Sequence, residues 1–359
     1  MSKGETKVHW NYRVAHRPGS AVPSYGIYEV YYDKDFDIAM YSKDPISPFG
    51  DTAEELEADV TMMLHAFNEV PLNLNHVDYM IRQKEKHVKN KEQPFFMYVA
   101  FHEPHEPVAS PKNMVDQYDG IARNHDQAQY FANVTNLDAA VGKLLKALKS
   151  MNLDQNTLVI FTSDNGPETL LRYGPRSGRS FGVADPLRGM KLWTTEAGFR
   201  VAGIMHWPAR IKPGQVSGEV VSALDFLPTF CDLAEAKVPT NLKLDGTSFL
   251  PALEGRGVKR EKPLLWVYYS ALNERRVAMR AGKWKVLARM NFPKTKTINQ
   301  KNVSQAKGAT LSDFQIFDLS QDIDESKNLA ETNPSKLKEL QNTMEIQYRE
   351  LVNDSHVWK

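Results

Sequence analysis

Three groups of polar residues have types and positions that suit chemistry on an anionic ester. Asp164 and Asn165 end an apolar, strand-like run, and their oxygen atoms are ligands that Ca²⁺ or Mg²⁺ prefers. His102 and His105 follow another such run, and Lys191 lies shortly before a third. In one cleft, a metal, an imidazole and an ammonium would polarise the ester, neutralise its charge and protonate its leaving group.

Each of these residues also has an ordinary structural explanation. Asn165 and Gly166 could form a turn after a strand, and a lone histidine is more often a surface residue than a catalytic one. A single lysine such as Lys191 is usually solvated. What decides between these explanations is whether the fold brings the groups together.

A loop rich in glycine and arginine, residues 167–189, separates the second strand-like run from Lys191. Its lack of hydrophobic periodicity and its length indicate a functional or disordered segment rather than a simple connection. Arg172, Arg176 and Arg179 could form a mobile surface loop or a basic rim that binds acidic substrates. We keep these three arginines as candidate substrate-binding residues.

The elements that must position these side chains alternate along the chain. Apolar runs at 95–101, 157–162 and 199–207 predict strands, and apolar residues at helical spacing predict helices at 126–150 and 220–236. This order favours an α/β fold with a mainly parallel central sheet flanked by helices. Polar residues at strand ends would then converge on one edge of the sheet.

The pattern changes in the last third of the chain. Short strand candidates separated by turns, followed by a helix from about Pro334 to Leu351, predict a smaller antiparallel sheet with one helix. We therefore expect three parts: a divergent region at 1–93, an α/β part at 94–255 and the small subdomain at 256–359.

The amino-acid composition and net charge limit the kinds of molecule that the chain is expected to bind. The 359 residues carry a net charge of +1, with 42% hydrophobic and 25% charged residues, which is ordinary for a globular protein. This balance gives no reason to expect nucleic acid or an anionic membrane as a partner. The single cysteine, Cys231, cannot form an internal disulfide, and the first residues show no secretory signal.

Several motifs in order along the chain resemble the sulfatase family, which belongs to the alkaline-phosphatase-like superfamily. The resemblance runs from about Pro94 to the C-terminus. The motifs are PFFMYVAFHEPHEP, NLDAAVGKLL, TLVIFTSDNG, LRGMKLWTTEAGFRV, WPARIKPG, LDFLPTFCDLA, LDGTSFLPAL, AGKWKVL and IFDLSQDIDESKNLA. Each motif is weak alone, and their joint order makes the resemblance specific.

The resemblance implies a role for each candidate residue. Asp164 and Asn165 match the acid–amide pair that ligates Ca²⁺ in the family. His105 matches the histidine that contacts the sulfate ester and can protonate the leaving group, with His102 beside it as a substrate-binding residue. Lys191 matches the lysine that binds sulfate oxygens. The chain is thus expected to be a sulfuric ester hydrolase, resembling arylsulfatases, that acts on a sulfated small molecule or glycan.

The start of the chain departs from the family pattern. Family members open with a strand whose two acidic residues complete the calcium site, and then carry a Cys- or Ser-x-Pro-x-Arg segment that yields the formylglycine nucleophile. Neither feature occurs among these residues, and the Lys7-Val8-His9 match to a family Lys-x-His pair rests on spacing alone. We therefore expect a truncated sulfatase with an incomplete calcium site and low or no activity.

Two other functions remain open. The chain could bind sulfated glycans without turnover, or could hydrolyse phosphate or phosphonate esters as other members of the superfamily do. Sulfatases are mostly exported to the periplasm, the lysosome or the cell exterior, but the sequence does not itself reveal a compartment. The natural substrate and the oligomeric state also stay undetermined by the sequence.

Overall fold

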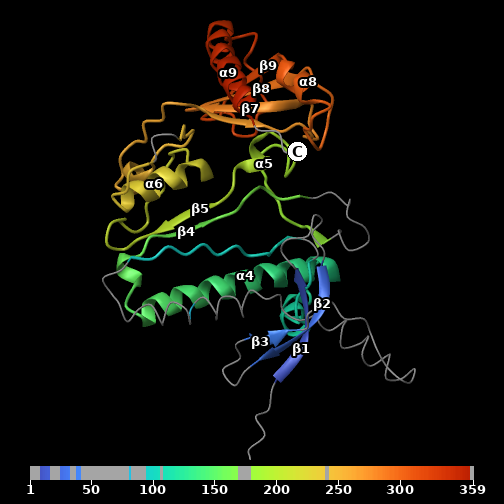
Figure 1. Cartoon of the computed structure of the whole chain (residues 1–359), viewed down its shortest axis with the longest axis vertical. Coiled ribbons are helices and arrows are strands. Elements are labelled where there is room, and N and C mark those ends of the chain that lie inside the picture. The colour runs from blue at the N-terminus through green and yellow to red at the C-terminus, as the bar shows by residue number, and fades with distance from the viewer. Residues whose placement is uncertain are drawn as a thin grey trace, which may run out of the picture. The chain divides into compact units, whose positions relative to one another are not determined.

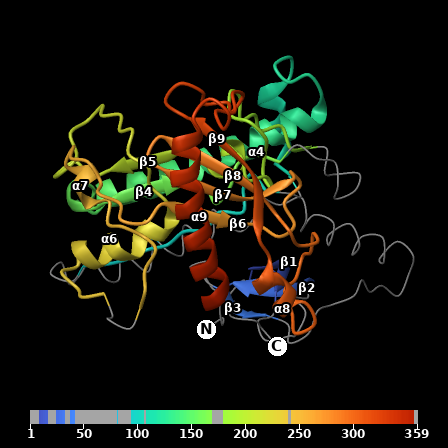
Figure 2. The same cartoon turned by 90° about the horizontal axis from the view of Figure 1, so that it is seen from above.

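The computed structural model describes residues 94–105, 108–168, 179–238 and 242–355, together with residue 81 and three strands nearer the start (Figures 1 and 2). The chain divides into two compact units. The first unit comprises residues 1–153 and 170–181, and the second comprises 154–169 and 182–359. No helix in the described part of the chain is long and apolar enough to span a membrane.

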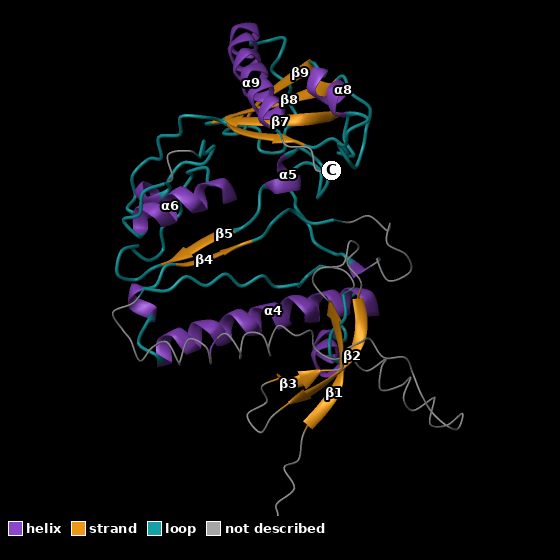
Figure 3. Cartoon of the chain, viewed as in Figure 1, coloured by secondary structure: helices purple, strands orange, loops and turns teal. Residues whose placement is uncertain are grey.

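The first unit contains a three-stranded antiparallel sheet of β1 (His9–His16), β2 (Tyr25–Tyr32) and β3 (Ile38–Tyr41), drawn in orange in Figure 3. β1 and β2 pair along their whole length, from His9 opposite Tyr32 to His16 opposite Tyr25. No sustained period in the sequence predicted these strands, although aromatic and β-branched residues are common in them.

The long helix α4 (His125–Ser150) confirms the helix predicted at 126–150. It begins where the Asn124 side chain accepts a hydrogen bond from the Gln127 amide at 2.9 Å, which is an N-cap contact. The side chains of Ala128 and Ala132 are buried against the short elements before it, so small residues allow close packing there. Those elements are α3 (Lys112–Val115) and η1 (Asp116–Tyr118).

The strand predicted at 95–101 is not formed. These residues have no regular secondary structure, and the Phe96 and Tyr98 residues are 72% and 75% exposed. Apolar composition does not make a strand by itself, because a strand also needs a neighbour that completes its hydrogen-bond ladder. The composition at 95–101 was therefore insufficient grounds for the prediction.

The second unit begins with a two-stranded sheet of β4 (Val159–Thr162) and β5 (Gly203–His206), after the short turn η2 (Asp154–Asn156). The two strands are antiparallel, with Val159 opposite His206 and Thr162 opposite Gly203. A mainly parallel sheet was predicted, whereas this pair of strands is antiparallel. Because they run in opposite directions, the start of β5 lies beside the end of β4, where the predicted site residues follow.

The C-terminal part of the second unit is a four-stranded antiparallel sheet, as predicted. Its strands lie in chain order and are β6 (Leu264–Val267), β7 (Arg275–Ala281), β8 (Trp284–Met290) and β9 (Leu311–Asp318). The helix α8 (Val303–Gly308) precedes β9, and α9 (Pro334–Asp354) confirms the predicted closing helix. α9 lies across one face of the sheet (Figure 2).

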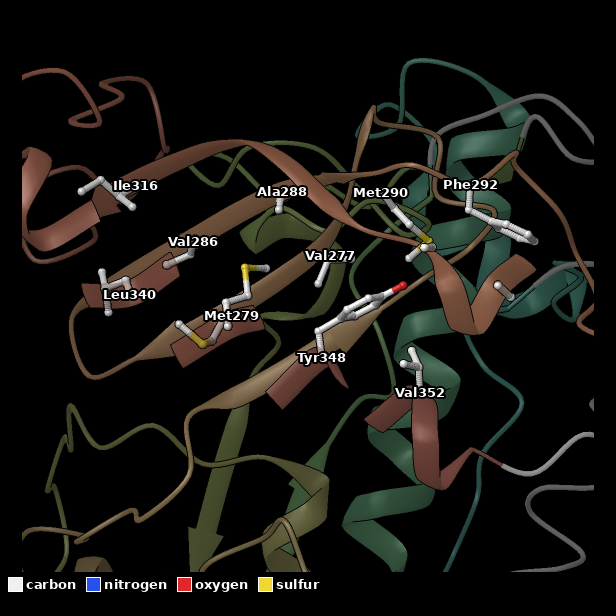
Figure 4. Close-up of a cluster of buried hydrophobic side chains, with 13 residues drawn as sticks. Val277, Met279, Val286, Ala288, Met290, Phe292, Ile316, Leu340, Tyr348 and Val352 are labelled. Carbon is white, nitrogen blue, oxygen red and sulfur yellow. The ribbon is translucent and has the colours of Figure 1, made fainter. Parts of the chain in front are cut away.

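The main core of the second unit lies between this sheet and α9 (Figure 4). Alternate residues of β7 and β8, such as Val277, Met279 and Val286, point to the helix, as the two-residue period of a strand requires. The helix contributes a stripe at strict four-residue spacing: Leu340, Met344, Tyr348 and Val352. Burying each large apolar side chain contributes about 1.5–3 kcal/mol, so this interface is a main source of stability.

The opposite face of the sheet packs against α5 (Glu196–Phe199). Its apolar residues include Ala278, Leu287 and Phe317, and they contact Phe199 and Trp266. The rings of Phe199 and Trp266 are stacked, with centroids 4.1 Å apart and planes 6° apart. In Figure 1, α5 lies next to this sheet within the second unit. The segment that precedes α5 contains Lys191.

The second unit also contains three short helices, the first of which ends at a buried carboxylate. They are η4 (Ala223–Asp225), α6 (Phe226–Leu233) and α7 (Leu250–Leu253). Asp225 is fully buried and accepts hydrogen bonds from the Ser222 amide, the Thr247 amide and the Arg260 guanidinium. An ideal Cβ on Gly246 would lie 1.9 Å from the Leu224 carbonyl oxygen, so the approach of these two segments requires glycine.

Candidate functional site

The turn after β4 presents the predicted carboxylate and amide at the surface of the second unit. Asp164 is exposed, and its Oδ1 accepts the Asn165 backbone N–H at 2.9 Å. The Asn165 Nδ2 donates to the Gly166 carbonyl at 3.0 Å, which leaves its amide oxygen as the side chain's acceptor. The turn therefore carries two hard oxygen donors of the kind that the sequence predicted.

Backbone contacts hold this turn against the segment that precedes β5. The Gly166 amide donates to the Gly198 carbonyl at 3.1 Å, and the Lys191 amide donates to the Pro167 carbonyl at 2.8 Å. An ideal Cβ on Gly166 would lie 1.8 Å from the Ala197 carbonyl oxygen, so only glycine permits this approach. The structure thus brings Lys191 to the turn that contains Asp164 and Asn165, as predicted.

The Lys191 ammonium lies beside a carboxylate that the sequence reasoning missed. Its Nζ is 3.8 Å from Oε2 of Glu168, and the Lys191 side chain is 19% exposed while that of Glu168 is 5% exposed. A charged residue in a loop is ordinarily solvated, so the sequence held no signal that Glu168 is buried. Lys191 is consequently a partly enclosed cation beside a buried carboxylate.

The backbone around Lys191 is strained. Leu192 has a φ of +74°, and Gly189 has a φ of +91°. A left-handed conformation is unfavourable for a bulky residue such as Leu192 and persists only where surrounding contacts enforce it. One such contact is the hydrogen bond from the Leu272 amide to the Leu192 carbonyl at 3.0 Å. The position of Lys191 is therefore set by tertiary contacts rather than by local preference.

The described residues fit a calcium ion only in part. Asp164 and Asn165 have the right chemistry, but Ca²⁺ takes six to eight oxygen ligands. Within the described part of the chain, no group of three or more His, Cys, Asp or Glu side chains could hold a metal ion. These two residues would form one side of a site.

The two predicted histidines lie together in the first unit. The His105 amide donates to the His102 carbonyl at 2.9 Å, and the two rings are in an edge-on arrangement with centroids 5.8 Å apart. Desolvation by the surrounding protein lowers the pKa of His102, and the nearby His105 lowers that pKa further. His102 therefore favours its neutral form.

Between the histidines, Glu103 points into the protein and is 5% exposed. Burial raises the pKa of its carboxyl, although a backbone contact and the Asn136 side chain act in the opposite direction. The Asn136 Nδ2 lies 3.4 Å from Glu103 Oε1. Glu103 thus fixes the histidine turn to α4.

The structure gives Arg179 structural partners. Its Nε donates to Asp126 Oδ1 at 2.9 Å, and its Nη1 donates to the Val108 carbonyl at 2.7 Å. Both contacts lie within the first unit, and the Arg179 side chain is 19% exposed. Its predicted substrate-binding role stays a prediction, and Arg172 and Arg176 lie outside the described residues.

Comparison with known proteins identifies the family of this chain. The model of the family described as "Sulfatase" matches residues 50–236, just over half of the chain. The chain belongs to the sulfatase family. A second family model, described as "N-sulphoglucosamine sulphohydrolase, C-terminal", matches residues 190–354 of the chain. The resemblance inferred from the sequence motifs is therefore confirmed.

Individual relatives agree with this assignment. Arylsulfatase A of Homo sapiens is 39% identical over 199 residues, which are 55% of this chain and 36% of that protein. N-acetylgalactosamine-6-sulfatase of Canis lupus familiaris is 31% identical over 216 residues, which are 58% and 39% of the two chains. The alignments thus span between a third and two fifths of these two curated relatives.

Solved structures confirm the fold class. The crystal structure of Ps i-CgsB superposes with a TM-score of 0.60 at 31% identity, and covers 77% of this chain and 54% of that one. The same protein in complex with k-i-k-neocarrahexaose gives a TM-score of 0.59. The α/β, alkaline-phosphatase-like fold predicted from the sequence is therefore shown, with the local differences in strand pairing described above.

Proposed function

We propose that this sulfatase binds sulfate esters through the Lys191 ammonium at the turn after β4. The observation that supports this function is the placement of Lys191 against Pro167 and Glu168, two to four residues after the Asp164–Asn165 pair. The ammonium would donate hydrogen bonds to the sulfate oxygens and neutralise their charge. Glu168, buried behind it, balances that cation when no ester is bound.

The family resemblance is the basis for the roles that we propose for the other predicted residues. We expect His105 to protonate the departing alcohol oxygen, with His102 as a neighbouring contact to the substrate. Asp164 and Asn165 would contribute two of the ligands of a calcium ion, which polarises sulfate oxygens when bound. The arginines at 172, 176 and 179 remain the predicted acidic-substrate rim.

The proposed substrates are sulfate esters of saccharides or aryl alcohols. N-acetylgalactosamine-6-sulfatase among the relatives and the oligosaccharide bound to Ps i-CgsB support a saccharide. The 359 residues contain no Cys- or Ser-x-Pro-x-Arg segment. We therefore expect the chain by itself to bind sulfate esters more readily than it hydrolyses them.

One set of assays tests this function. The purified chain is incubated with an aryl sulfate and, in parallel, with an aryl phosphate, and release of inorganic sulfate or phosphate is measured. Binding of inorganic sulfate is measured by calorimetry. We expect measurable sulfate binding that Lys191→Ala abolishes and that Lys212→Ala, on an exposed turn, leaves unchanged. Equal sulfate affinity in the wild type and Lys191→Ala would refute the proposal.

A second candidate is a sulfated-glycan binding protein without turnover. The oligosaccharide complex of Ps i-CgsB favours it, since that relative has a binding surface for a saccharide. Salt-sensitive binding to a sulfated glycan, with no release of sulfate, would support this candidate. Release of phosphate from the aryl phosphate alone would instead indicate the phosphoesterase function of the wider superfamily.

A further inference from the structure

A group of charged side chains is buried between α5 and the C-terminal sheet. Glu196, at the start of α5, is 3% exposed, while Lys285 on β8 and Glu325, after β9, are both 0% exposed. The Lys285 Nζ is 2.8 Å from Glu196 Oε1 and 3.8 Å from Glu325 Oε1. We call these three residues the Lys285 network.

The network connects three separate segments of the second unit. Glu325 Oε2 accepts the Glu196 backbone N–H at 2.8 Å, so both the side chain and the backbone of Glu196 are held. Arg280 on β7 adds an Nη1 contact to Glu196 Oε2 at 3.2 Å. The Lys285 ammonium also lies over the Phe199 ring, 4.0 Å from its centroid. Glu196 is thus held by contacts from β7, from β8 and from the segment after β9.

Stability alone does not explain this burial. Removing charged groups from water is costly, and well-packed apolar residues often replace a buried ion pair at no loss of stability. The pKa of Lys285 is lowered, and that of Glu325 is raised, in both cases because burial disfavours the charged form. A buried ionic network does, however, permit few alternative geometries, because any displacement moves a buried charge away from its partner.

The segment that the network holds is the one that contains Lys191. Glu196 follows Lys191 by five residues, and the strained Leu192 lies between them. Two further contacts fix the middle of the segment: the Thr194 amide donates to Asn273 Oδ1 at 3.0 Å, and the Asn273 Nδ2 donates to Thr194 Oγ1 at 2.9 Å. The segment is therefore held at its start by Pro167 and at its end by the C-terminal sheet.

We infer that Lys285 is a positioning residue for sulfate binding: through Glu196 and Glu325, the C-terminal sheet sets the place of the Lys191 ammonium. This inference rests on the proposed function of Lys191. Lys285 itself touches no ligand, because it is fully buried on the α5 side of β8. The C-terminal sheet then helps to set the geometry of the site, and α9 stabilises that sheet by packing on its other face.

The test compares three variants of the full chain. Lys285→Met removes the cation, and Lys285→Met/Glu196→Gln/Glu325→Gln removes the charges of the whole network. Lys283→Met is the matched control, because Lys283 lies two residues away, is 53% exposed and pairs with Asp318 at 2.6 Å. Each variant is studied under conditions where urea titration shows it to be folded. If Lys285→Met does not fold, Glu325→Gln, which retains the Lys285–Glu196 contact, replaces it.

Two measurements are made on each variant. The first is the affinity for inorganic sulfate, and the second is the rate at which an amine-acylating reagent modifies Lys191, followed by mass spectrometry. We expect at least tenfold weaker sulfate binding and several-fold faster acylation of Lys191 in Lys285→Met. The triple variant should regain stability relative to Lys285→Met without regaining sulfate affinity, and Lys283→Met should behave as wild type in both measurements.

The two readouts separate this inference from the proposed function. Wild-type chain that binds no sulfate would overturn the proposed function, while the acylation rate of Lys191 would still report its position. Folded Lys285→Met with the wild-type acylation rate, or with wild-type sulfate affinity, would overturn the inference. A triple variant with both stability and sulfate affinity restored would show that the network is structural only.

Discussion

Gly166→Ala is the sharpest test of how the site is assembled. An added Cβ would lie 1.8 Å from the Ala197 carbonyl oxygen and 2.9 Å from its carbon, whereas real Cβ contacts are rarely shorter than 3.0 Å. The turn after β4 and the segment before α5 must therefore separate by at least 1.2 Å, the difference between 1.8 and 3.0 Å. Both contacts are to backbone atoms, so no side chain can rotate away to relieve them.

The cost follows from what this separation breaks. The Gly166–Gly198 and Lys191–Pro167 backbone hydrogen bonds, at 3.1 and 2.8 Å, span the gap that must open. Each lost bond costs about 0.5–1.5 kcal/mol, and overpacking a close contact costs about 1–3 kcal/mol more. We expect the free energy of unfolding to fall by about 2–6 kcal/mol on these two grounds together. We also expect sulfate affinity to fall by about tenfold or more, because Lys191 moves with its segment.

Urea unfolding and sulfate calorimetry measure the two effects. The control is Gly203→Ala at the start of β5, because an added Cβ there meets no atom within 4 Å and the backbone has no positive φ. That substitution should change stability by no more than about 1 kcal/mol, and in the favourable direction. A Gly166→Ala chain as stable as Gly203→Ala, with unchanged sulfate affinity, would refute the proposed packing of the turn against Ala197.

Two further predictions concern titration and metal. Burial raises the pKa of Tyr348 to about 12. The folded state therefore retains the phenol proton at pH values above 10, where the unfolded state loses it. The free energy of unfolding is unaffected by this group below pH 10 and falls by about 3 kcal/mol as the pH rises to 12. Tyr348→Phe should abolish that pH dependence in urea titrations, and should cost little at pH 7, because the buried hydroxyl has no hydrogen-bond partner among the described residues. A steeper alkaline loss in Tyr348→Phe than in wild type would contradict this. Ca²⁺ at about 1 mM should raise the free energy of unfolding by no more than about 1 kcal/mol, since two ligands bind it weakly, and Asp164→Asn should remove that increment; a much larger shift would indicate a complete calcium site.

The elements that could be predicted from the sequence are those whose hydrophobic periodicity indicates which of their faces is buried. α4 and α9 have apolar residues at helical spacing, and the C-terminal strands have short apolar runs between turns, so both were predicted closely. The run at 95–101 has an equally apolar pattern but forms no strand, because strand formation depends on a neighbour that the pattern does not encode.

The position of Lys191 was predicted correctly from a wrong premise. In a parallel sheet, a residue before a strand would lie at the opposite edge from residues that follow a neighbouring strand. Lys191 reaches the Asp164 turn because β5 runs antiparallel to β4, with Gly203 opposite Thr162. Strand direction is a property of the whole chain path, so the local sequence could not have corrected the error.

The partners of the site residues could not be predicted at all. These partners are charged residues, and such residues are mostly exposed in proteins. They lie in loops, at the start of a helix or on a strand, and are Glu168, Glu196, Lys285 and Glu325. Their burial depends on contacts between segments that lie far apart in the sequence, such as the 89 residues between Glu196 and Lys285. A hydrophobic pattern with a period of two or 3.6 residues does not reveal such pairs.

The motif residues of the site differ in what they specify. Asp164, Asn165 and Lys191 provide the polar groups of the predicted site. Gly166 and Gly198 instead allow backbone segments to approach closely, since an added Cβ on Gly198 would lie 2.1 Å from the Trp193 carbonyl oxygen. The Gly166 N–H donates a backbone hydrogen bond to the Gly198 carbonyl across the same contact. The motifs TSDNG and TTEAGF therefore encode a single feature, which is the close approach of two backbones at Gly166 and Gly198.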